Sequence, residues 1–204
     1  MRNKSDFILN AIFMVVGSLL IGFGVAFVVA GNIGGDALTT LQVGISRKFH
    51  ISVPSASLVT NIFSLSLLFM FFRKRFSIAT LCSPFLITLG NYLMSFVTAT
   101  IRLDIMLIRM LCMLFGLVII GIGIGIGAQS PSSSNPYDSL IIGLSEKFKI
   151  SFSMTRIFVD AAVLITGLLL KGTWGIGTII AILLQGVLGE FFIRIFRKKV
   201  APAK

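Results

Sequence analysis

The chain has 204 residues, of which 56% are hydrophobic and only 12% are charged, and its mean hydropathy is +1.01. A soluble domain of this length cannot bury so much apolar surface, because its core is limited by its volume. A net charge of +11 suggests nucleic acid in a soluble protein, but no basic helix or aromatic platform accompanies it here. The composition therefore predicts an integral membrane protein with lipid as its main partner, and it argues against nucleic-acid binding.

Six apolar stretches approach the length of about 20 residues that a bilayer crossing takes. The first is far longer than the apolar region of a signal peptide, so we expect it to be retained as a span. The fifth is the weakest, because Asp160 interrupts it. The six predicted spans are residues 7–30, 54–72, 77–99, 105–128, 152–170 and 175–195.

The basic residues predict the orientation of these spans. With a cytoplasmic N-terminus, 13 of the 18 Lys and Arg residues fall on the cytoplasmic side. Basic loops are retained on that side of the membrane. An even number of spans with both termini in the cytoplasm is therefore favoured.

An internal repeat runs through the chain. Residues 41–52 (LQVGISRKFHIS) reappear 99 positions later as residues 140–151 (LIIGLSEKFKIS), with seven of 12 positions identical. Three spans in each copy would make the second copy enter the membrane from the opposite face. We therefore expect an all-α polytopic membrane protein, a single domain over residues 1–204. It would be a three-plus-three inverted repeat with copies at 7–100 and 105–197.

A short helix is predicted after the first span of each copy. The preceding segments, 31–36 and 130–136, are rich in the residues that break helices. Asp36 and its counterpart Asn135 suit the N-cap, and Pro136 suits the first helical position. Each short helix would lie in the interface or enter the membrane as a re-entrant half-helix. Ser52 and Ser151 would then cap the spans that follow.

Asp160 is the sharpest candidate for a functional residue. An acid within a span has a partner or lines a wet cavity. It could bind a proton or a cation near the boundary between the repeats. It could also be neutralised by Arg156, four residues earlier on the same helical face.

Four further polar residues are candidates for substrate or ion binding. Asn61 aligns with Asp160 and Asn91 with Glu190, and the two asparagines could be ligands or helix–helix hydrogen-bond partners. Glu190 could bind an ion or form a surface pair with Arg194. Asp138 could complement the dipole of its short helix or face a ligand.

Other chemistry finds no support in the sequence. The single histidine, His50, lies in a basic segment, and the two cysteines, Cys82 and Cys112, lie apart in apolar stretches. We therefore expect no metal and no cofactor. No serine–histidine–aspartate set or catalytic pair of carboxylates can be assembled, so we do not expect an enzyme.

Several motifs resemble those of the YczE/YyaS/YitT group of bacterial integral membrane proteins, and its YczE branch in particular. They are Pro136-Tyr137-Asp138, the Arg156–Asp160 spacing, the Gly-Ile-Gly-Thr turn at 175–178, and Gly-Gly-Asp-Ala at 34–37. The chain has no room for the soluble C-terminal domain of YitT-type members. The resemblance implies a multi-pass protein of the bacterial inner (plasma) membrane, commonly described with five spans. It implies no established activity.

Two functions follow as expectations. The leading one is a small secondary transporter or channel-like protein for an ion or small solute, supported by the repeat, the short helices and Asp160. The alternative is a membrane accessory or regulatory protein that acts through a protein partner, using a cytoplasmic basic face of residues 73–75 and the C-terminal tail. A homodimer is compatible with either.

Overall fold

The computed structural model describes residues 4–51, 53–101, 104–129 and 135–199, and every regular element within these ranges is helical. The expected all-α class is thus confirmed. The elements are α1 (Lys4–Gly31), α2 (Ala37–Phe49), α3 (Val53–Phe71), η1 (Arg73–Arg75), α4 (Ile78–Thr98), α5 (Met106–Gly127), α6 (Pro136–Phe148), α7 (Phe152–Leu169) and α8 (Ile176–Lys199).

Five helices in the described ranges are long and apolar enough to cross a membrane, namely α1, α4, α5, α7 and α8. Large apolar side chains on their outer faces, such as Phe85 (70% exposed) and Leu169 (79% exposed), suit contact with lipid rather than water. The second predicted span corresponds to α3, whose apolar stretch Ser55–Phe71 is shorter than the other five. The structure therefore indicates a membrane-embedded protein, and six spans stay a prediction.

Helices α2 and α6 have 13 residues each. Their length of about 20 Å is too short for a hydrocarbon layer of about 30 Å. The expected caps are confirmed, because Asp36 accepts a hydrogen bond from the Thr39 backbone and Asn135 accepts one from the Asp138 backbone. Ser151 caps α7 as predicted, whereas Ser52 lies outside the described residues.

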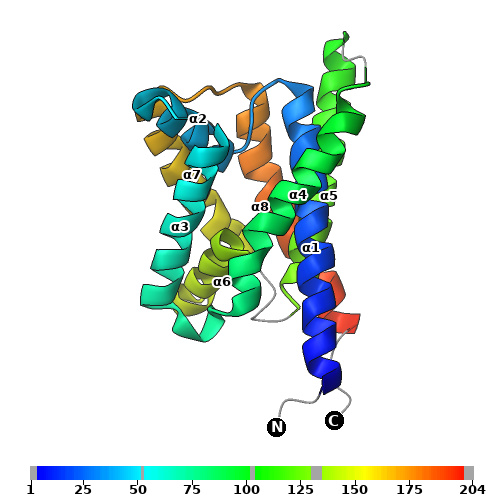
Figure 1. The fold of residues 1–204 in the computed structure, drawn as a ribbon, viewed down its shortest axis with the longest axis vertical. Helices are drawn as coiled ribbons and strands as arrows, with labels where there is room; N and C mark the ends of the chain where they lie inside the picture. The colour runs from blue at the N-terminus through cyan, green and yellow to red at the C-terminus, as the bar shows by residue number, and fades with distance from the viewer. Residues whose placement is uncertain (1–3, 52, 102–103, 130–134, 200–204) are drawn as a thin grey trace.

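The two short helices run toward opposite ends of the molecule. At the C-terminal end of α2, Arg47 donates to the Lys171 carbonyl in the connection between α7 and α8. At the end of α6, Arg75 of η1 pairs with Glu146. Figure 1 shows the connection between α7 and α8 at one end of the molecule and η1 at the other. The start of α1 and the end of α8 lie at the same end as η1. Both short helices therefore begin in the interior.

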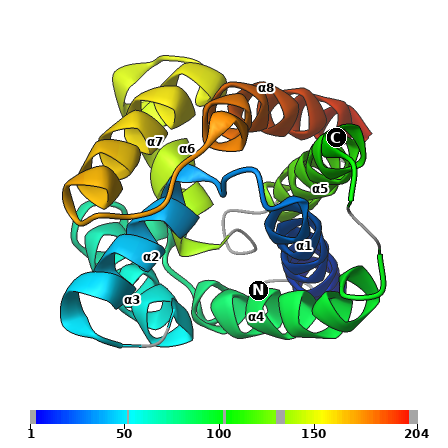
Figure 2. The same ribbon diagram turned by 90° about the horizontal axis from the view of Figure 1, so that it is seen from above.

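Seen from above, α1, α3, α4, α5, α7 and α8 surround the interior, and α2 and α6 pack against α3 and α7 (Figure 2). Helices α1 and α5 approach closely through glycines. A Cβ atom on Gly17 would lie 2.9 Å from the Gly123 carbonyl oxygen, and one on Gly24 would lie 2.5 Å from that of Gly116. These contacts are reciprocal in the 99-residue register, as in an interface with two-fold symmetry. They support the predicted repeat and its copies, which themselves stay predictions.

Candidate functional site

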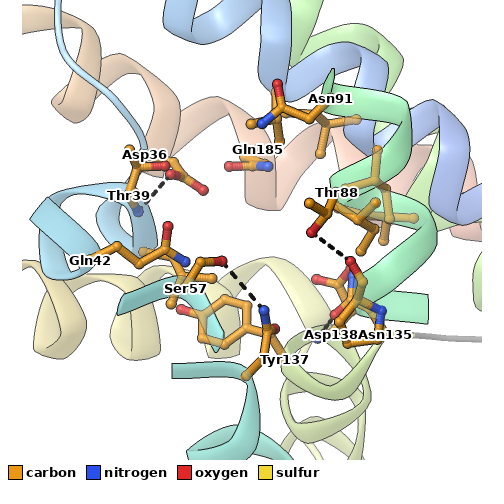
Figure 3. Close-up of a pocket in the computed structure, with 18 of the residues that line it drawn as sticks. Asp36, Thr39, Gln42, Ser57, Thr88, Asn91, Asn135, Tyr137, Asp138 and Gln185 are labelled. Atoms are coloured by element: carbon orange, nitrogen blue, oxygen red, sulfur yellow. Dashed lines mark hydrogen bonds between the residues drawn. The ribbon is translucent and has the colours of Figure 1, made fainter. Parts of the chain in front are cut away.

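A polar cavity of ≈ 140 Å³ lies between the first turns of α2 and α6. A cavity of this volume has room for several water molecules. Figure 3 shows Asp36 and Thr39 on one side and Asn135 and Asp138 across from them. Four predicted site residues line this one cavity: Asp138 from the first turn of α6, and Asn61, Asn91 and Arg156 from α3, α4 and α7.

Arg156 forms the centre of a buried charged cluster behind the first turn of α6. Its side chain is 4% exposed, and its Nη1 donates to Asp138 Oδ1 at 2.6 Å. Its Nε lies 3.4 Å from Asp160 Oδ2, and Asp160 Oδ1 accepts a hydrogen bond from the Tyr137 hydroxyl at 2.5 Å. Burying one guanidinium with two carboxylates requires such pairing, because an isolated ion is strongly disfavoured there.

Two aromatic rings enclose the guanidinium of Arg156. The centroids of Tyr137 and Phe152 lie 5.8 Å and 5.9 Å from its Cζ. Cation–π attraction of this kind is strongest where water is excluded. Asp160 does not itself line the cavity. It accepts a hydrogen bond from Tyr137 and pairs with Arg156, and both of these residues line the cavity.

The first half of the chain carries neutral residues at the equivalent positions. Ser57 occupies the position of Arg156 and Asn61 that of Asp160, 99 residues earlier. Asn61 Nδ2 lies 3.5 Å from Ser57 Oγ. The cavity is therefore asymmetric in charge, and Asp36 is the carboxylate that the first half brings to it.

Glu190 lies apart from this cavity. It lines a second pocket of ≈ 340 Å³ near η1, together with Arg75, Glu146 and Arg194. One carboxylate oxygen accepts from the Ser153 backbone at the start of α7, and the other pairs with Arg194. The sequence-based pairing of Glu190 with Arg194 is thus confirmed, and the acid also caps a helix.

Several residues that line the cavity are not among the site residues predicted from the sequence, and Asp36, Tyr137 and Gln185 matter most of these for its chemistry. The sequence assigns Asp36 only the role of a cap, although its alignment with Asn135 places both residues at the start of a short helix. The sequence marks Tyr137 only as part of the Pro136-Tyr137-Asp138 motif and does not predict it as a site residue. Gln185 is not among the sequence-based candidates, although an uncharged amide in the middle of an apolar stretch is the pattern of a residue that faces a polar interior.

The known proteins that the chain resembles are themselves uncharacterised. It is 29% identical to the "Uncharacterized protein YyaS" of Bacillus subtilis (strain 168), over 90% of this chain and 92% of that protein. It is 23% identical to an "Uncharacterized protein" of Haemophilus influenzae (strain ATCC 51907 / DSM 11121 / KW20 / Rd), over 88% of this chain and 81% of that one.

No solved structure gives a significant match to the chain. The likeness to YyaS confirms the resemblance predicted from the motifs around Pro136 and Arg156. One family profile matches residues 8–194, which is most of the sequence. The chain therefore belongs to the family of unknown function DUF6198.

Proposed function

We propose that this protein carries a small solute or ion across the membrane, as a secondary transporter or a channel-like protein. The observation that carries the proposal is the meeting of two oppositely directed half-helices at one polar cavity. In a membrane, non-helical backbone is tolerated where it lines a cavity or is buried in protein. Broken helices that begin near the middle of the bilayer are a recurrent way of building a transport site.

The predicted inverted repeat strengthens this proposal. Two copies in opposite orientation place their symmetry axis in the membrane plane, and the solute site lies where the copies meet. The reciprocal contacts between α1 and α5 follow this symmetry, and the first turns of α2 and α6 provide the site. An inner-membrane location with both termini in the cytoplasm belongs to the same proposal.

Asp160 takes a supporting role in this proposal. It pairs with Arg156 and fixes the Tyr137 hydroxyl, so it positions cavity residues instead of contacting the solute. Asp138 lines the cavity directly and shares Arg156 with Asp160. We expect Asp160→Asn to reduce transport by disturbing Tyr137 and Arg156.

The test is solute flux through purified protein reconstituted into liposomes. Light scattering would report osmotic responses to gradients of NaCl, KCl, urea and glycerol, and an enclosed pH dye would report protons. We expect at least one probe to pass faster than through protein-free liposomes. Asn91→Phe should block that flux, because Asn91 lines the cavity.

The matched control is Leu93→Phe, which adds the same ring on the same helix at a side chain that is 51% exposed. It should keep the flux. Equal flux in both variants, or no flux of any probe, would contradict the proposal. The alternative of an accessory protein has less support, since Arg75 of the predicted basic face already pairs with Glu146.

A further inference from the structure

Gln185 of α8 has an unmet hydrogen-bonding requirement. Its side-chain oxygen Oε1 is buried and has no hydrogen-bond partner among the described residues, and the residue is 2% exposed. It lines the cavity, and Figure 3 shows its amide between Asp36 and Asn91. A buried acceptor without a partner is unfavourable, so its presence at a cavity indicates that something inside the cavity satisfies it.

Asp36 brings a negative charge to the same cavity without a matching cation. One of its carboxylate oxygens accepts from the Thr39 backbone at 2.9 Å. Within the described part of the chain, the ion pairs of Asp138 and Asp160 both go to Arg156, and Asp36 forms none. Of the three carboxylates in and behind the cavity, Asp36 is therefore the one that no guanidinium neutralises.

The sign of the whole site follows from these charges. Three carboxylates and one guanidinium leave two negative charges when all are ionised. The N-terminal ends of α2 and α6 contribute roughly half a positive charge each. These two helix ends would attract an anion on their own, but the carboxylates outweigh them by about one charge. The cavity therefore favours one positive charge.

We propose that the cavity binds a single small monovalent cation between the carboxylate of Asp36 and the amide oxygen of Gln185. The inference deepens the proposed transport function and rests on it. A divalent ion fits less well, because its two charges exceed the one that the cavity favours. No group of three His, Cys, Asp or Glu side chains suited to a metal occurs in the described ranges. The volume of ≈ 140 Å³ accommodates an inorganic ion or a small ammonium.

The test is thermal unfolding of the full chain in detergent, with N-methylglucamine chloride replaced stepwise by NaCl, KCl, NH₄Cl or methylammonium chloride at constant ionic strength. A cation that binds only the folded protein raises the melting temperature in a saturable way. We expect a rise of about 3 °C or more with at least one of these salts. The four salts separate an alkali-metal ion from an ammonium ion.

Two variants locate the site. Asp36→Asn removes the charge and keeps a good N-cap, and Gln185→Leu removes the unpaired oxygen, so both should fold. Each should raise the apparent dissociation constant of the cation at least tenfold. The matched control is Gln129→Leu, because Gln129 lines the second pocket. This variant should leave the apparent dissociation constant of the cation unchanged.

Absence of saturable stabilisation by all four cations would overturn the inference, as would unchanged binding in both Asp36→Asn and Gln185→Leu. Flux of a neutral probe in liposomes without cation binding would also overturn it, while leaving the transport proposal standing. Cation binding that depends on both residues without any flux would support the inference and contradict transport alone.

Discussion

Removing the guanidinium of Arg156 is expected to destabilise the protein strongly. The nearest nitrogen–oxygen distances to Asp138 and Asp160 are 2.6 Å and 3.4 Å. At an effective dielectric constant of about 20, these separations give about 6 and about 5 kcal/mol of attraction. Burial of the three ions costs several kcal/mol each, so the intact cluster contributes little net stability.

The Arg156→Met variant would leave two buried carboxylates without their partner. Breaking a buried ion pair in this way costs about 3–5 kcal/mol. For a chain of this length, each kcal/mol lowers the melting temperature by about 2–4 °C, so we expect a drop of about 6–20 °C. Asp160→Asn leaves Arg156 paired with Asp138 and should cost only about 1–2 kcal/mol.

Thermal unfolding of the purified protein in detergent would measure both variants. The double variant Arg156→Met/Asp138→Asn should be more stable than Arg156→Met alone, because it removes one of the two unpaired charges. The reasoning would be refuted if Arg156→Met unfolded at the wild-type temperature. It would also be refuted if the second substitution lowered the stability further.

Three other predictions concern packing, capping and orientation. Gly24→Val should lower the melting temperature by about 2–12 °C, because overpacking costs about 1–3 kcal/mol. The new Cβ would lie 2.5 Å from the Gly116 carbonyl oxygen. Unchanged stability would contradict the close approach of α1 and α5. Asn135→Ala should cost about 1 kcal/mol through loss of the α6 cap, whereas Asn135→Ser should be milder, because its hydroxyl can still accept from the Asp138 backbone, as thermal unfolding would show. In a cysteine-free background, a cysteine at Arg73 should react with an impermeant maleimide only after cell lysis, and one at Lys171 should react in intact cells; labelling of both in intact cells would refute the proposed orientation.

Much of the helical architecture could be predicted from the sequence, because it depends on local chemistry. The apolar length of each stretch sets where a helix can lie in lipid. Asp36, Asn135 and Ser151 start helices because their side chains accept hydrogen bonds from backbone groups three residues ahead. The pair of Arg156 and Asp160 was foreseeable, since residues four apart share a helical face.

The site itself depends on contacts between distant segments, which spacing along the chain does not encode. Asp138 meets Arg156 only because α6 packs on α7. Gln185 and Asp36 come to one cavity from helices α8 and α2, which are far apart in the sequence. Glu190 looked equivalent to Asn91, yet tertiary packing sends it to a different pocket. The sequence by itself determined the helices and their caps. The packing of α2 and α6 against the longer helices decided which polar residues share one interior, because burial and pairing depend on three-dimensional neighbours.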